Sequence, residues 1–146
     1  MPSLTPFVQA LVVEHDPVML DLIGRWAASA FVTAHSSRDE TEALTIAARH
    51  PISAAIIADC TGGQLDSQGL AERLRALRPA LPLVFLADSA ERLHLAHRAF
   101  LPRATTVRRP FQIADLSSAL ERVLHEATAA HEIGPTTRRG NDPPAR

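Results

Sequence analysis

Five short apolar runs, each followed by a stretch with helical periodicity, are the feature that most limits how this chain can fold. Short apolar runs bounded by turn-forming residues are typical of strands that are buried on both faces of a parallel sheet. Their alternation with helices predicts right-handed crossovers and helices on both faces of the sheet. The runs are Val8–Val13, Phe31–Ala34, Ala54–Ala58, Leu83–Leu86 and Ala104–Val107.

The segments between the runs carry apolar residues at helical spacing and clear start signals. Asp16 is a good N-cap with Pro17 at the first helical position, and Ser37-x-x-Glu40 predicts a capping box for the second helix. A third helix, with Leu70, Leu74 and Leu77 inward, is expected from about Ser67 to a stop before Pro79. The inward positions expected for the fourth helix are Leu93, Ala96, His97 and Phe100, and those for the fifth are Ile113, Leu116, Leu120, Val123 and Leu124.

The predicted fold class is therefore α/β, a doubly wound (βα)5 domain with a five-stranded parallel sheet of order 2-1-3-4-5. The length of 146 residues suits one domain, which we place at residues 7–126. Residues 131–146 are rich in Pro, Gly, Thr and Arg and lack apolar periodicity, so we expect a disordered tail there.

Composition narrows the function classes. A formal net charge of −1 favours neither nucleic acid nor an anionic membrane as a partner. The single cysteine, Cys60, excludes a disulfide framework within the chain and indicates a reducing cytoplasm, and no apolar run is long enough to span a membrane. Every basic side chain is arginine or histidine, and Arg73, Arg75 and Arg78 are expected on the solvated face of the third helix.

Three acidic residues follow strands that meet at one edge of the predicted sheet. Glu14 and Asp16 come after the first run and Asp59 after the third, where the topological switch point places the ligand site. Converging carboxylates repel each other unless a cation or proton lies among them, and oxygen ligands favour Mg²⁺. The alternative is that Asp16 only caps a helix while Glu14 and Asp59 face water.

The order of these landmarks resembles the receiver domains of bacterial two-component response regulators. Leu11–Leu22 is similar to their acidic opening, Ala54–Leu70 to the segment around the phosphoacceptor aspartate, Leu83–Asp88 to the fourth strand, and Val107–Phe111 to the Lys-Pro end of the fifth. The resemblance covers about residues 7–126. It implies a flavodoxin-like fold, a non-enzymatic signalling module, Asp59 as phosphoacceptor, Mg²⁺ as cofactor, and a cis bond at Arg109–Pro110.

The sequence departs from the family's pattern at most of the other site positions. The acidic pair falls on Glu14 and His15, so we expect Mg²⁺ binding by Glu14, Asp16 and Asp59 to be weak or lost. The hydroxyl position falls on Ala87, the aromatic switch position on Thr106, and the lysine position on Arg109.

Two readings of the receiver function stay open at this point. In the first, Asp59 accepts a phosphoryl group from a histidine kinase or phosphotransfer protein, and the domain binds a downstream protein through its fourth helix, fifth strand and fifth helix. In the second, it is a phosphorylation-independent binding module. A flavodoxin-like flavin binder or enzyme is disfavoured, because the acidic loop Glu14–Pro17 would repel a phosphate. Homodimerisation, the kinase, and whether the chain is excised from a longer protein stay open.

Overall fold

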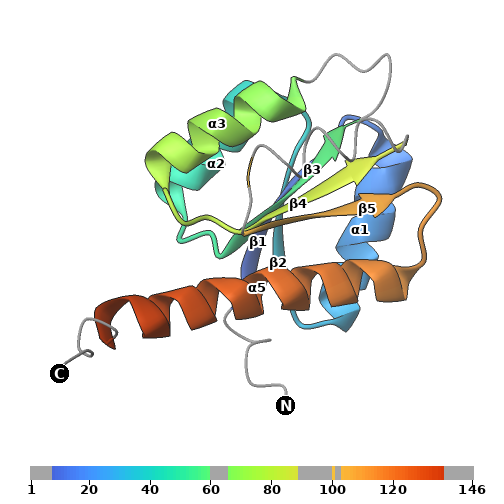
Figure 1. Ribbon diagram of the computed structural model, residues 1–146. Coiled ribbons are helices and arrows are strands. Elements are labelled where there is room, and N and C mark those ends of the chain that lie inside the picture. The colour runs from blue at the N-terminus through green and yellow to red at the C-terminus, as the bar shows by residue number, and fades with distance from the viewer. Residues whose placement is uncertain (1–7, 60–65, 89–99, 101–102, 137–146) are drawn as a thin grey trace, which may run out of the picture.

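The computed structural model describes residues 8–59, 66–88, 100 and 103–136, with side chains in the last helix described up to residue 126. It contains a five-stranded parallel sheet of order β2-β1-β3-β4-β5, which confirms the predicted strand order (Figure 1). The strands are β1 (Gln9–Val13), β2 (Thr33–Ser37), β3 (Ala54–Asp59), β4 (Leu83–Ala87) and β5 (Ala104–Arg108).

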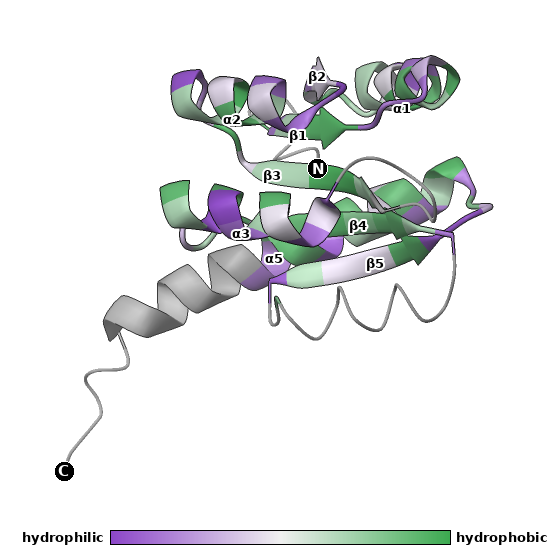
Figure 2. Cartoon of the chain, turned by 90° about the horizontal axis from the view of Figure 1, so that it is seen from above, coloured by the Kyte–Doolittle hydropathy of each residue, from purple (hydrophilic) through white to green (hydrophobic). Residues whose placement is uncertain are grey.

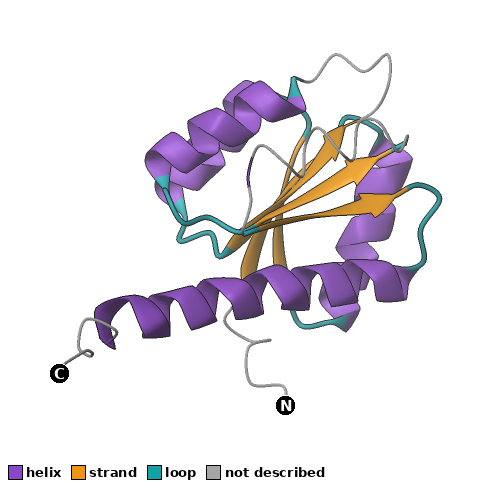
Figure 3. Cartoon of the chain, viewed as in Figure 1, coloured by secondary structure: helices purple, strands orange, loops and turns teal. Residues whose placement is uncertain are grey.

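Four described helices cover the two faces of the sheet. They are α1 (Pro17–Ser29), α2 (Glu40–Arg49), α3 (Ser67–Leu77) and α5 (Ile113–Thr136). Figures 1 and 3 show α2 and α3 together on one face and α1 with α5 on the other. The helix expected over Leu93–Phe100 lies outside the described residues except for Phe100, which is helical and buried.

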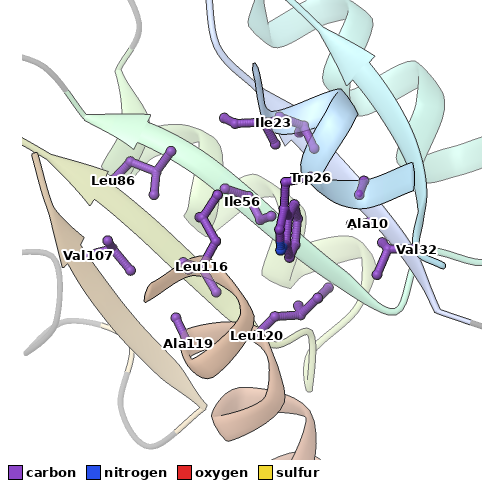
Figure 4. Packing of buried hydrophobic residues seen from close by; sticks show 14 of the residues in the cluster. Ala10, Ile23, Trp26, Val32, Ile56, Leu86, Val107, Leu116, Ala119 and Leu120 are labelled. Carbon is purple, nitrogen blue, oxygen red and sulfur yellow. The ribbon is translucent and has the colours of Figure 1, made fainter. Parts of the chain in front are cut away.

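Two apolar cores result, one on each side of the sheet, because alternate strand residues point to opposite faces. Even-numbered residues of β1 face α1 and α5, while Leu11 and Val13 face α2 and α3. Figure 2 shows hydrophobic residues along β3 and β4, and Figure 4 shows Trp26 packed among side chains from the sheet, α1 and α5. The Trp26 indole N–H donates to the Ser117 hydroxyl at 2.8 Å, which joins α1 to α5.

The second strand is the element that the sequence placed wrongly. The apolar run Phe31–Ala34 predicted it, but β2 starts at Thr33 and continues to Ser37, which pairs with Val13. The capping box at Ser37 is therefore also wrong, because the Ser37 hydroxyl donates to the Val12 carbonyl instead.

The N-cap of α2 is Asp39. Its carboxylate accepts from the Glu42 N–H at 2.8 Å, and the Glu42 carboxylate in turn accepts from the Arg38 N–H at 3.0 Å. The helix is thus capped two residues later than predicted, and Glu42 accepts from the residue before the N-cap, so the two bonds do not form a capping box.

Two of the three arginines expected on a solvated face of α3 are instead bound to carbonyl groups. Arg75 donates to the carbonyl oxygens of Leu81, Phe100 and Arg103 at 2.8–3.2 Å, and burial lowers its pKa, with a smaller contribution from Arg103. Arg78 donates to the carbonyl oxygens of Ala47 and His50, which lie at the end of α2. Leu77, expected inward, is 51% exposed.

The last helix continues beyond the boundary expected from the sequence. α5 extends to Thr136, so residues 131–136 are helical in a region for which we expected disorder. Alanine and glutamate, which are strong helix formers, make up five of the seven residues from Glu126 to Glu132 and favour continuation of the helix into this region. Residues 137–146 lie outside the described part of the chain.

The turn after α1 contains a strained residue. The Val32 N–H donates to Ala27 and the Phe31 N–H to Ala28, the pattern of a helix end in which the residue after the cap adopts a left-handed conformation. That residue is usually glycine, but here it is Phe31, with φ of 60° and a side chain that is 71% exposed.

Replacement of Phe31 should reveal this strain. We expect Phe31→Gly to be more stable than Phe31→Ala by about 0.5–1 kcal/mol, because glycine relieves the left-handed penalty and both variants lose the same exposed ring. Urea denaturation midpoints of the two variants measure the difference. An alanine variant as stable as the glycine variant would contradict the strain.

A histidine pair should make stability depend on pH. His35 in β2 lies against His50, with ring centroids 4.4 Å apart, and its Nε2 is 2.9 Å from the Gln9 side-chain oxygen. Burial, and secondarily the charge of His50, lower the pKa of His35 below 6.5. The unfolded chain therefore takes up this proton first as the pH falls, so the free energy of unfolding should fall below pH 6.5.

The measurement is urea denaturation at several pH values for wild type, His35→Gln and the exposed α5 control His125→Gln. Below the ordinary histidine pKa, the slope of the free energy of unfolding against pH should become smaller in His35→Gln and should stay unchanged in His125→Gln. An unchanged slope in His35→Gln would assign the pH dependence to other groups.

Candidate functional site

The carboxyl edge of the sheet brings together residues from four strands. Val13 at the end of β1 is in register with Ile57 of β3, and Asp59 at the end of β3 is in register with Ala87 of β4. Arg109 directly follows β5. The backbone therefore places the segments that carry Glu14, Asp59 and Arg109 at one edge of the sheet; the Asp59 side chain lies outside the described part of the structure.

Glu14 does not face water, as the alternative reading required; its side chain is only 1% exposed. One carboxylate oxygen accepts from the guanidinium of Arg109, and the other accepts from the backbone N–H of Asp16 at 3.1 Å. A buried carboxylate needs such partners, because desolvation would otherwise strongly disfavour its charge. Glu14 is thus a structural anion paired with an arginine 95 residues later in the chain.

Asp16 acts as the N-cap of α1, as the sequence predicted. Its carboxylate accepts from the Val18 N–H at 3.0 Å. His15 lies between the two acidic residues with its side chain 59% exposed, and its Nδ1 is 3.5 Å from Glu14. Within the described residues, no group of three or more His, Cys, Asp or Glu side chains is placed to hold a metal ion.

Arg109 is fixed by both its backbone and its side chain. Its N–H donates to the Ala87 carbonyl at 2.8 Å, and its side chain, which is 18% exposed, contacts Glu14 through the guanidinium. The Arg109–Pro110 bond is cis, which confirms the expectation drawn from the resemblance. Since β3 and β4 lie between β1 and β5, the Arg109–Glu14 pair passes across the carboxyl ends of these two central strands.

The two remaining predicted positions lie in β4 and β5. Ala87 is completely buried and offers only a methyl group. Thr106 is half-buried and lines a groove of about 430 Å³ between β5 and α5. The other residues of this groove, which sequence reasoning did not single out, are Thr105, Val107, Arg108, Asp115, Ser118, Ala119 and Arg122.

Among the described residues, no helix is both long and apolar enough to cross a membrane.

Sequence comparisons identify no relative: no protein-family model matches the chain, and no curated protein matches it.

Solved structures, in contrast, share its fold. A receiver domain protein, CheY-like, from Methanospirillum hungatei superposes with a TM-score of 0.72 at 17% identity, over 84% of this chain and 97% of that one. A response regulator receiver protein from Sinorhizobium medicae gives 0.72 at 16% identity, over 82% and 96%.

NtrX from Brucella abortus, in a complex with ADP, gives a TM-score of 0.79 at 20% identity. The alignment covers 92% of this chain but only 31% of NtrX, so the chain corresponds to about a third of that larger protein. Together with the strand order, these superpositions show that the chain has the flavodoxin-like fold of response regulator receiver domains.

Proposed function

We propose that this chain is a two-component receiver-like domain that works by binding other signalling proteins, with Asp59 as its phosphoacceptor. The observation that carries the proposal is the placement of Asp59 at the carboxyl end of β3, on the edge where Glu14 and Arg109 meet. In a doubly wound sheet this edge is where ligands and reactive groups are found. The resemblance of the sequence to receivers assigns the phosphoacceptor to the same residue.

A phosphodonor protein would approach along α1. This helix begins beside the carboxyl edge, directly after Asp16, and presents two apolar side chains to solvent: Val18 is 76% exposed and Leu22 is 41% exposed. Exposed apolar side chains four residues apart lie on one helix face. They offer a histidine kinase or phosphotransfer protein a contact surface next to the reactive edge.

A downstream partner would bind on the side of β5 and α5. The lining of the groove around Thr106 combines hydroxyl groups, two arginines and one aspartate with apolar surface, so it offers many hydrogen-bonding groups. A protein partner with complementary hydrogen-bonding groups fits such a surface better than a hydrophobic small molecule does. The groove therefore favours a signalling function over flavin binding.

A second candidate function is a binding module that does not depend on phosphorylation. The observation in its favour is the Glu14–Arg109 pair, which already neutralises the buried carboxylate, together with Ala87, which has no hydroxyl to donate. Both features reduce the number of stabilising contacts that a phosphoryl group on Asp59 would make.

Chemical phosphorylation separates these candidates. Incubation with acetyl phosphate and Mg²⁺ should add one phosphoryl group to wild type, as measured by intact mass, and Asp59→Asn should abolish the gain. Asp66→Asn is the matched control, because Asp66 is a nearby carboxylate that caps α3 and should leave the gain unchanged. Absence of a gain in wild type, or its persistence in Asp59→Asn, would refute the phosphoacceptor assignment.

The response of the domain to phosphorylation should be local. A ligand shifts a conformational equilibrium only by interacting differently with the two states, and the methyl group of Ala87 cannot bond to a phosphoryl oxygen. Amide resonances should therefore change near Asp59 when beryllofluoride is added, with little change over Leu93–Phe100 and Ala104–Val107.

Ala87→Ser provides the matched test of this reasoning, because it restores a hydroxyl at the end of β4. The serine variant should spread the beryllofluoride-induced changes into β5. Large changes over β5 already in wild type would show that the response does not need the missing hydroxyl.

A further inference from the structure

Two of the three acidic residues expected to hold Mg²⁺, Glu14 and Asp16, do not fit that ion in this chain. Both oxygens of Glu14 already accept hydrogen bonds, one from the guanidinium of Arg109 and the other from the Asp16 N–H. The Asp16 carboxylate accepts from the Val18 N–H and caps α1. Mg²⁺ demands well-placed oxygen ligands in a near-octahedral arrangement, but the Arg109 guanidinium already lies against Glu14 and the cap bond turns Asp16 toward the backbone.

The cation that balances Glu14 is instead part of the chain. The Glu14 side chain is 1% exposed, so its charge has little access to solvent and requires a partner within the protein. Arg109 supplies a permanent positive charge, because a guanidinium does not lose its proton in proteins. Its backbone bond to the Ala87 carbonyl holds the residue at the end of β4, from which the side chain reaches the end of β1.

We propose that Arg109 is the resident cation of this site and takes the place of the divalent metal. The charge of Glu14 is balanced without Mg²⁺, and the ion can bind Glu14 only after the guanidinium leaves it. This inference deepens the proposed receiver function, since it concerns the same edge of the sheet. It differs from the sequence-based expectation of weak binding, which rested on His15, because here the obstacle is an occupied carboxylate.

Thermal unfolding in MgCl₂ tests the proposal, with NaCl of equal ionic strength as the reference. Wild type should show the same Tm in both salts. Arg109→Met should unfold at a lower temperature than wild type, because Glu14 loses its counter-charge. Mg²⁺ should then raise the Tm of this variant, by about 5 °C at ten times the Kd of the ion.

Two further variants make the result specific. In Glu14→Gln combined with Arg109→Met, the Mg²⁺-dependent rise should disappear, because the carboxylate is gone. Arg73→Met removes an arginine from the more exposed ion pair with Glu40 and should give no Mg²⁺ response. Equal stabilisation of wild type and Arg109→Met by Mg²⁺, no stabilisation of Arg109→Met, or a rise that persists in the double variant would each overturn the proposal.

A measurement on wild type alone keeps the proposal testable if Arg109→Met does not fold. Mn²⁺ broadens the amide resonances of residues near the ion. Because we expect no divalent ion to bind at Glu14, the signals of Glu14, His15 and Asp16 should stay sharp when Mn²⁺ is added. Selective broadening of these signals would overturn the proposal. Neither experiment uses a phosphodonor or a partner protein, so their failure is distinguishable from failure of the proposed function.

Discussion

Burial of the central strands on both faces is the constraint on which the rest of this structure depends. Every residue of β4, and every residue of β3 from Ala54 to Ala58, is at most 4% exposed. A polar side chain inside these strands would lose its hydration without gaining a partner, so polar chemistry is confined to the strand ends. Glu14 and Arg109 lie at such ends, and the burial that surrounds Glu14 is what makes its pairing with a cation obligatory.

The same constraint explains how much of the fold the sequence revealed. The central strands β3 and β4 were predictable because burial on two faces requires continuous apolar runs. The edge strand β2 was misplaced because its residues, Thr33–Ser37, are mostly polar and only Ser37 is buried. The apolar Phe31 was counted as part of the strand, but it lies in the turn before β2 and its ring is exposed.

The candidate site was predictable in its location but not in its contacts. Strand order brings residues at the strand ends to one edge, so the positions of Glu14 and Arg109 followed from the topology. Residue types do not reveal which oxygen accepts from which donor across 95 residues of chain. The capping role of Asp16 was predictable, because an N-cap bond involves only its immediate neighbours.

The absence of lysine gives the arginines a shared structural role. A guanidinium presents several donors in a fixed plane, whereas an ammonium group is a single point charge. Arg75 uses this geometry to bind three carbonyl oxygens, and Arg78 binds two at the end of α2.

Arg109 extends the same principle from backbone carbonyls to a buried carboxylate. A metal ion at this edge would exchange with solvent, and its occupancy would follow the concentration of the ion. A guanidinium anchored by its own backbone does not exchange, so the charge at the edge is constant and the end of β5 stays tied to β4 and β1. Under the proposal that Arg109 takes the place of the metal, regulation of this edge would come from groups that compete for the guanidinium or from proteins that bind nearby.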